Sequence, residues 1–255
     1  MPKILHLSDL HFGTETKAML DLLLMDLEQI EPDLIVISGD FTQRALHSQF
    51  RSAQQFLKVL DKKKVLCVPG NHDISLHNPF ERFFYPFEKY KRYISKTLNP
   101  QLEIQGLAIL GVNSVTPFKS IQGKITTAQL NVIHNYFRSF PATTVKIAVM
   151  HHNLIRSDRH KIISNSEELI ATLGASKVNL VLSGHLHYAC YEQIERDSFA
   201  HPLYVVTAGT AVSRRLRQGQ NSYNILQIDS SYCKMSVRVY DKNQFITFKE
   251  NEFNL

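Results

Sequence analysis

The chain is poor in cysteine and has no long apolar run. Its three cysteines, Cys67, Cys190 and Cys233, lie far apart and form no CxxC pair. This excludes a zinc-finger framework and a secreted disulfide scaffold, so we expect free thiols in a reducing compartment. The longest apolar runs, such as 34–37, are far shorter than the roughly 20 residues of a membrane-spanning helix, and no signal-peptide core follows the first methionine. We therefore expect a cytoplasmic protein without a membrane segment.

The composition is that of a folded globular protein. Hydrophobic residues make up 44% and charged residues 20% of the 255 positions, which excludes extensive disorder. This length suits a single domain, which we expect to span 1–255. Lysine and arginine outnumber aspartate and glutamate by 29 to 23, and the resulting net charge of +6 favours an anionic ligand. Most basic residues are scattered, so nucleic acid is a poor candidate partner. The sequence leaves a homodimer open.

Apolar patterns alternate between strand-like and helix-like segments. A buried strand at 3–8 is followed by a helix at 17–30, whose apolar side chains recur at helical spacing, and then by a strand at 34–38. Short strands separated by helices indicate βαβ crossovers and a largely parallel sheet. Further helices are predicted at 48–60, 127–137 and 166–173, and further strands at 65–68, 102–104, 107–112, 146–150, 178–182, 189–194, 203–207, 223–228, 235–240 and 245–248. We expect an α/β fold of two packed mixed sheets flanked by helices, a four-layer α-β-β-α sandwich.

Residues 78–100 are dense in aromatic side chains. They contain seven of the chain's 25 aromatics, with lysine and arginine between them. Because this insertion follows a polar cluster at 70–73 directly, we expect it to form a cap near the functional site. Stacking of Tyr85, Tyr90 or Tyr93 on a nucleobase would give such a cap a function. A helical segment packed on the core and a contact between two copies are the alternatives.

Polar clusters rich in histidine and aspartate stand where predicted strands end. Ligands of such sheet proteins bind beyond the carboxyl ends of the strands, so we expect the clusters to meet there as a metal site. Carboxylate, imidazole and amide groups suit manganese, iron or zinc, and the lack of thiolates argues against structural zinc. The clusters are Asp9-Leu10-His11, Gly39-Asp40, Gly70-Asn71-His72-Asp73, Asn113, His151-His152 and Gly184-His185-Leu186-His187.

The order of these clusters resembles the calcineurin-like metallophosphoesterases. Their pattern is D-x-H, G-D, G-N-H-[D/E], H and G-H-x-H, and all five blocks are present in order between 9 and 187. Gly39-Asp40-Phe41-Thr42 and the segments 206–217 and 221–224 are similar to the bacterial class III cyclic nucleotide phosphodiesterases. Ala45 and His47 depart from the glycine and the acid that relatives often carry at these positions.

The resemblance implies two divalent or trivalent metal ions, drawn from manganese, iron and zinc. One ion would be held by Asp9, His11, Asp40 and His187, and the other by Asp40, Asn71, His151 and His185, with Asp40 bridging. Of the adjacent histidines, His151 matches the family's ligand position. His152 would therefore lie behind the ligands or face the substrate.

The implied chemistry is attack of a metal-bridged hydroxide on phosphorus, opposite the leaving alkoxide. The leaving oxygen then needs a proton, and His72 is the natural donor. We expect the carboxylate of Asp73 to raise the pKa of His72 and to fix its tautomer. An aspartate that follows a strand is also a common helix N-cap, which gives Asp73 a structural alternative.

Other polar residues near these clusters are candidates for substrate binding. We expect His152 and Asn113 to face the substrate. A guanidinium fork fits two phosphate oxygens, so at least one of Arg214, Arg215 and Arg217 is expected to face the substrate, with solvated surface charge as the alternative.

The resemblance implies a phosphodiesterase for a small anionic phosphodiester, with a 3′,5′-cyclic nucleotide such as cyclic AMP as the leading candidate. Another phosphoester or pyrophosphate hydrolase is the alternative among enzymes. A glycerophosphodiesterase is one such enzyme. A UDP-2,3-diacylglucosamine pyrophosphatase is another, although that family usually has arginine where this chain has His72. No motif outside the metal set supports a protein phosphatase or a DNA nuclease. A non-catalytic scaffold on the same fold is the alternative of a different class, and the complete ligand set argues against it.

Overall fold

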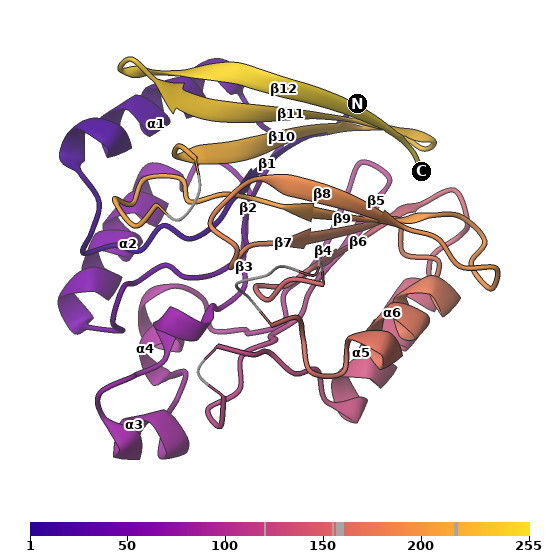
Figure 1. Cartoon of the computed structure of the whole chain (residues 1–255), viewed down its shortest axis with the longest axis horizontal. Helices are drawn as coiled ribbons and strands as arrows, with labels where there is room; N and C mark the ends of the chain where they lie inside the picture. Colours follow the sequence, from indigo (N-terminus) through magenta and orange to yellow (C-terminus); the bar gives the residue numbers. More distant parts are fainter. Residues whose placement is uncertain (120, 155, 157–160, 217–218) are drawn as a thin grey trace.

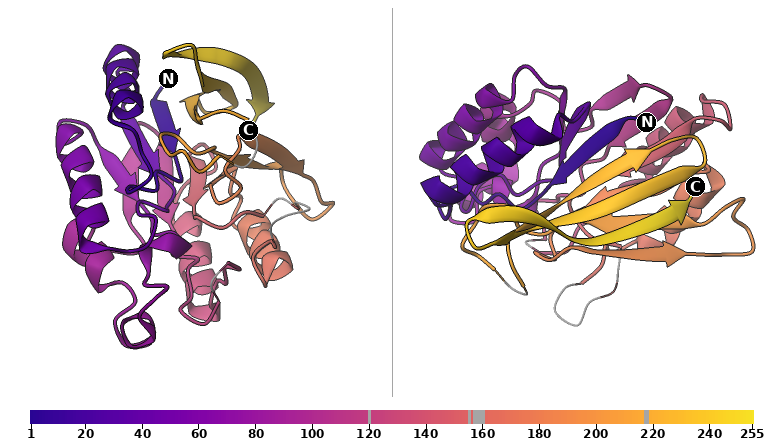
Figure 2. Two further views of the ribbon diagram at one scale, coloured as in Figure 1. Left: turned by 60° about the vertical axis from the view of Figure 1, so that its left-hand side comes forward. Right: turned by 90° about the horizontal axis from the view of Figure 1, so that it is seen from above.

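The computed structural model describes residues 1–119, 121–154, 156, 161–216 and 219–255 (Figure 1). Within these residues, two six-stranded sheets pack face to face and carry helices on both outer sides (Figures 1 and 2). The strand order is β12-β11-β10-β1-β2-β3 in one sheet and β4-β5-β6-β7-β9-β8 in the other. The expected four-layer α-β-β-α arrangement of two mixed sheets is confirmed.

The first sheet combines three parallel strands with an antiparallel meander from the end of the chain. Its parallel strands are β1 (Lys3–Leu7), β2 (Leu34–Ile37) and β3 (Val65–Cys67), and the meander is β10 (Ser222–Ile228), β11 (Tyr232–Asp241) and β12 (Gln244–Asn254). Side chains alternate between the two faces, so Ile4 points into the core between the sheets while Leu5 points outward. Helices α1 (Lys17–Ile30) and α2 (His47–Val59) bury their apolar faces on that outer side.

The second sheet has a parallel centre and antiparallel edges. Its strands are β4 (Gln101–Ile104), β5 (Leu107–Gly111), β6 (Val145–Val149), β7 (Leu180–Ser183), β8 (Cys190–Ile194) and β9 (Leu203–Thr207), with β4 and β8 as the antiparallel edges. Helices α5 (Thr127–Arg138) and α6 (Ser166–Ala175) cover its outer face. The space between the sheets is filled by fully buried side chains such as Val36, Ile147 and Leu182. This core fixes the relative position of the strand ends that carry the polar clusters.

The aromatic segment divides into two short helices with opposite environments. Helix α4 (Glu88–Tyr93) packs on α2, whereas α3 (Pro79–Phe84) projects from the edge of the molecule (Figure 1). Tyr90 is fully buried, and Tyr93 stacks on Phe50 and has its hydroxyl 3.1 Å from Nδ1 of His47. The expectation that Tyr90 stacks on a nucleobase is therefore wrong, since its ring belongs to the core. His47, one of the two departures from the family pattern, has a structural partner in Tyr93.

None of the helices in the described part of the chain is long and apolar enough to cross a membrane. Cys67, Cys190 and Cys233 are all free, as expected. Burial raises the pKa of the Cys67 thiol to about 12 and that of Cys233 to about 12, which keeps both protonated and unreactive.

Candidate metal centre

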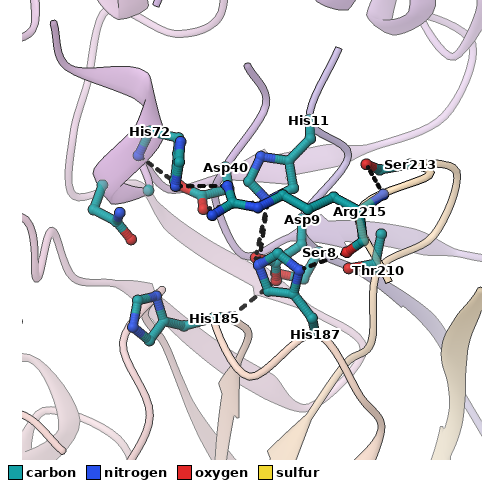
Figure 3. Close-up of polar contacts among 12 residues, drawn as sticks. Ser8, Asp9, His11, Asp40, His72, His185, His187, Thr210, Ser213 and Arg215 are labelled. Carbon is teal, nitrogen blue, oxygen red and sulfur yellow. Dashed lines mark hydrogen bonds and ion pairs between the residues drawn. The ribbon is translucent and has the colours of Figure 1, made fainter. Parts of the chain in front are cut away.

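The strand-end clusters from both sheets meet at one buried site (Figure 3). The donor atoms of Asp9, His11, Asp40 and His187 all lie within 4.8 Å of one another, and all four residues are buried. These are the four residues that the family pattern assigns to one metal ion. Residues 9 and 187 are far apart in the sequence, so only the packing of the two sheets brings them together.

A second group of donors adjoins the first. Nε2 of His151 lies 3.1 Å from Oδ1 of Asn71, 3.3 Å from Nδ1 of His185 and 3.4 Å from Oδ2 of Asp40. These four residues are the second predicted set. Oδ2 of Asp40 also lies 3.6 Å from Nε2 of His11, so this carboxylate stands between the two groups, as a bridging ligand must.

Each carboxylate has one oxygen held by hydrogen bonds and the other aimed at the imidazoles. Oδ2 of Asp9 accepts the hydroxyl of Ser8 at 2.7 Å and the backbone N–H of His185 at 2.9 Å. Oδ1 of Asp40 accepts the backbone N–H of His72 at 2.8 Å. These bonds fix both side chains and leave Oδ1 of Asp9 and Oδ2 of Asp40 for a cation.

Two of the imidazoles are oriented by backbone carbonyls. Nδ1 of His151 donates to the carbonyl of Ser38 at 2.8 Å, and Nδ1 of His187 donates to the carbonyl of Arg215 at 3.0 Å. A carbonyl oxygen can only accept, so Nδ1 carries a proton in both rings and Nε2 is the atom that faces the site. Burial lowers the pKa of His151, but Asp40 outweighs it and raises this pKa to about 9, so a metal ion would displace a proton from Nε2 of this ring. The ring then has the tautomer that a metal-binding histidine needs.

The donor set fits a pair of metal ions. Among the described residues, Oδ1 of Asp9 and Oδ2 of Asp40 accept no hydrogen bond although they are buried. Nε2 of His11 and Nε2 of His187 face each other at 3.3 Å, where they can share at most one proton. Burial raises the pKa of both aspartates, but the neighbouring imidazoles outweigh it and hold each pKa well below its usual range. Both groups are therefore carboxylates, the form that binds metal.

The backbone at this site is strained. Eleven non-glycine residues of the described chain have a positive φ, and five of them belong to the predicted ligand set, namely Asp9, His11, Asp40, His185 and His187. Such a conformation costs roughly 1–3 kcal/mol for a residue with a Cβ and is concentrated at functional sites. The strain turns each side chain off the end of its strand and into the site. Sequence reasoning missed this feature, since no residue type marks it.

Two glycines allow the loops to approach one another closely. A Cβ at Gly70 would lie 2.1 Å from the backbone nitrogen of Asp40, and a Cβ at Gly184 would lie 1.8 Å from Oγ of Ser8. No side chain fits at either position, which explains why both clusters begin with glycine.

His72 lies beside the metal ligands but in a different electrostatic state from the one expected. Its Nδ1 donates to the carbonyl of Gln43 at 2.8 Å, and its Nε2 accepts from Nη1 of Arg215 at 2.8 Å (Figure 3). Its ring meets that of His11 edge to face, with 4.9 Å between centroids. Burial lowers the pKa of His72 to about 4. The expectation that Asp73 raises this pKa and fixes the tautomer is wrong, because the carbonyl of Gln43 fixes it instead.

Asp73 ties together the loops that follow β2 and β3. Its carboxylate accepts the backbone N–H groups of Phe41 at 3.2 Å, Thr42 at 2.9 Å and Gly70 at 2.9 Å, and also the hydroxyl of Thr42 at 3.2 Å. Burial raises its pKa to about 7, with a further contribution from Asp40. Asp73 is the last residue of the 3₁₀ turn Asn71–Asp73, whose N-cap is Gly70, so the expected N-cap role is wrong. Its contacts give it a different structural role, which is to join the two loops.

The structure places the remaining substrate-binding candidates behind or beside the ligands. His152 is buried, with Nδ1 2.8 Å from Oγ of Ser114 and its ring 4.9 Å from that of His185. Burial lowers its pKa to about 3. Asn113 is half-buried and accepts the backbone N–H of Val115 at 2.9 Å, which makes a local turn.

Of the three candidate arginines, the structure brings Arg215 to the site. The side chain of Arg214 is exposed and lines a separate surface cavity of about 440 Å³ together with Thr16, Met19 and Lys242. Arg217 lies outside the described residues.

The sequence did not reveal the roles of Ser38 and Gln43. Their backbone carbonyls orient the rings of His151 and His72, and any residue type would supply such a carbonyl.

Comparison with known proteins identifies the class that this fold and site define. Residues 2–189 match the family model of the calcineurin-like phosphoesterases, and the chain belongs to that family. It is a metal-dependent phosphoester hydrolase.

Two curated relatives and one solved structure are similar to this chain. The chain is 27% identical over 182 residues to a probable cyclic nucleotide phosphodiesterase of Ruthia magnifica subsp. Calyptogena magnifica, which covers 69% of this chain and 71% of the relative. It is 26% identical over 163 residues to a probable glycerophosphodiester phosphodiesterase of Arcobacter nitrofigilis, which covers 62% and 57%. A purple acid phosphatase from yellow lupin (Lupinus luteus) superposes with a TM-score of 0.71 at 13% identity over 99% of this chain and 53% of that chain, which shows a shared fold.

Proposed function

We propose that the protein hydrolyses a small phosphodiester at the dinuclear site, with a 3′,5′-cyclic nucleotide such as cyclic AMP as the substrate. The observation that carries this proposal is the guanidinium of Arg215 beside the ligand set, 2.8 Å from His72. A planar cation at this point suits the oxygens of a bound phosphodiester. The relative from Ruthia magnifica supports the choice of a cyclic nucleotide. We place the activity in the cytoplasm, in keeping with three free cysteines.

Manganese, iron or zinc suits the imidazole, carboxylate and amide donors. One ion would be held by Asp9, His11, Asp40 and His187, and the other by Asp40, Asn71, His151 and His185. When bound, such a pair polarises the phosphoryl oxygens and lowers the pKa of a water molecule. The buried, hydrogen-bonded aspartates keep the donor atoms in place before any ion arrives.

The chain's own residues orient the substrate and act on its leaving group. Arg215 would bind a phosphoryl oxygen and would then give up its bond to His72. This exchange leaves Nε2 of His72 facing the bound diester. With Nε2 free, His72 can take up a proton from solvent beside the anionic diester while Nδ1 keeps its bond to the carbonyl of Gln43. We propose that the resulting imidazolium gives this Nε2 proton to the leaving alkoxide and returns to its neutral form. Asp73 would be the anchor that holds the loop of His72 against the loop of Asp40. His152 and Asn113 stay proposals as substrate neighbours, supported by the sequence alone.

A glycerophosphodiester is the second candidate substrate, because the relative from Arcobacter nitrofigilis carries that name. A hydrolysis panel with added manganese separates the possibilities. It compares cyclic AMP, cyclic GMP, glycerophosphodiesters, bis(p-nitrophenyl) phosphate and p-nitrophenyl phosphate. We expect both diester classes to be hydrolysed faster than the monoester, with the highest kcat/KM among natural substrates for a cyclic nucleotide. Preference for a glycerophosphodiester would replace the first candidate by the second, and hydrolysis of the monoester alone would contradict both.

A further inference from the structure

The outer face of α3 carries a group of exposed aromatic side chains, here called the aromatic platform. Its members are Phe80, Phe83, Phe84, Tyr85 and, from the loop after β5, Phe118. Phe118 is 83% exposed, Phe84 68% and Phe80 64%. A single exposed aromatic needs no explanation, but a contiguous apolar patch marks an interaction site. None of these five side chains serves the metal centre.

The rings of the platform form two groups in contact, which α3 places side by side. Ring centroids lie 4.9 Å apart for Phe80 and Phe84, 6.0 Å for Phe80 and Tyr85, and 5.6 Å for Phe83 and Phe118. Phe80, Phe83 and Phe84 follow the i, i+3, i+4 spacing of one helix face. Helix α3 lies at the lower edge of the molecule in Figure 1, and the side chains of this face are exposed.

A buried arginine, Arg82, links the two segments that carry the platform. The guanidinium of Arg82 donates to the backbone carbonyls of Ser75 at 3.1 Å, Pro117 at 2.8 Å and Lys119 at 3.3 Å. These bonds join α3 to the loop of Phe118. The aromatic rings are therefore presented outward by a fixed frame and do not fold back onto the core.

Exposed cations outnumber exposed anions in the segments that contain the platform. In residues 76–96 and 117–124, Arg82 is buried and Lys89 pairs with Glu81, and one glutamate, Glu88, is exposed. The exposed cations of these segments are Lys91, Arg92, Lys96, Lys119 and Lys124. Lys119 is exposed and directly follows Phe118. Aromatic rings that enter the interface, with cations beside them, are the features that bind a protein to an anionic lipid surface. A symmetric contact between two copies would instead bring two equally charged surfaces together.

We propose that the aromatic platform docks the protein on an anionic lipid surface. Helix α3 begins seven residues after His72, so its first residue, Pro79, lies within about 25 Å of His72 even if the connection is fully extended. Docking would hold the centre near the lipid headgroups. The proposal does not depend on which phosphoester the site hydrolyses.

Flotation of the full chain with lipid vesicles tests the proposal. The vesicles are phosphatidylcholine alone or phosphatidylcholine mixed with phosphatidylglycerol, each at low and high salt. We expect the protein to float with the anionic vesicles, and this binding to weaken in high salt because the charges are screened. The triple variant Phe80→Ser, Phe84→Ser, Phe118→Ser should lose vesicle binding. Lys119→Ala should bind roughly fivefold more weakly, the loss expected for one cation near the surface.

The matched control is Phe248→Ser, which removes an aromatic that is 72% exposed on β12, away from the platform. It should float like the unaltered protein. Turnover of bis(p-nitrophenyl) phosphate and metal content check that the triple variant is folded. If it is not folded, the single variant Phe118→Ser replaces it in the flotation experiment.

Failure of the unaltered protein to float with anionic vesicles would overturn the proposal, as would equal flotation of the triple variant. A dimer that the triple variant dissociates, without vesicle binding by either protein, would assign the platform to a second copy of the chain and would equally overturn it.

Discussion

Arg215 touches two functional histidines in different ways. Its Nη1 lies 2.8 Å from Nε2 of His72, while its backbone carbonyl accepts Nδ1 of His187 at 3.0 Å. Any residue supplies the carbonyl, but only arginine supplies the planar fork. Substitution of the side chain therefore separates the two contacts, since the orientation of His187 should survive and the contact with His72 should not.

Arg215→Ala should lower kcat/KM for phosphodiesters by about 10²–10³-fold, the typical loss when one donor to a charged oxygen is removed. Metal content should be unchanged, because the carbonyl that orients His187 is kept. Arg215→Lys should recover part of the loss, since lysine restores the charge without the fork. Arg214→Ala is the matched control, because that side chain lines a separate cavity. Equal losses in Arg215→Ala and Arg214→Ala would exclude a specific role for Arg215.

His72→Ala should slow substrates according to how much their leaving group needs a proton. General acid catalysis contributes about 10²–10⁴-fold, and the ribose alkoxide of cyclic AMP should show most of that loss. Bis(p-nitrophenyl) phosphate should lose much less, because p-nitrophenolate leaves without a proton. Kinetics on both substrates, with metal content measured in parallel, test this. Similar losses on the two substrates would make His72 a positioning residue and would contradict its role as the proton donor.

Asp73→Asn should act on stability and not on leaving-group dependence. The amide nitrogen would face the backbone N–H groups of Thr42 or Gly70, which now donate to the carboxylate. Loss of such bonds costs about 1–3 kcal/mol in the free energy of unfolding, which urea denaturation measures. The ratio of cyclic AMP to bis(p-nitrophenyl) phosphate turnover should stay as in the unaltered protein. A changed ratio at unaltered stability would return Asp73 to a catalytic role.

Asp40→Asn should remove metal from both positions and abolish activity, because an amide offsets no charge on either ion. Asp26→Asn is the control, since Asp26 is also buried but lies on α1, where it pairs with Arg238 of β11 and Tyr223 of β10. That variant should lose stability and keep its metal content. Elemental analysis of both proteins measures the difference, and two metals per chain in Asp40→Asn would show that Asp40 does not bridge.

Local patterns in the sequence were sufficient for most elements of the fold. The helix predicted at 17–30 is α1 to the residue, because its apolar spacing, the N-cap Thr16 and Pro32 mark both ends. The strand predicted at 203–207 is likewise β9. By contrast β12 (Gln244–Asn254) continues well past the predicted 245–248. It is the edge strand of its sheet, so its exposed lysine and glutamates do not show an apolar alternation.

The ligand residues could be predicted from the sequence, but their surroundings could not. Short motifs contain the ligands, whereas the bond of His72 to the carbonyl of Gln43 depends on how two loops pack. The same holds for Arg215, which is 143 positions from His72 in the sequence. For Tyr90 the sequence predicted a substrate contact, whereas the side chain is fully buried in the core. An aromatic residue between charged residues gives no local sign of such burial.

A metal titration tests whether this chain is a phosphodiesterase that works with two metal ions per site. The protein is stripped with a chelator, manganese is added stepwise, and hydrolysis of bis(p-nitrophenyl) phosphate is followed at each ratio of metal to chain. We expect no hydrolysis without metal and a rise that levels off at two equivalents per chain. Full activity at one equivalent would contradict the dinuclear site, and no hydrolysis at any ratio would contradict the phosphodiesterase itself.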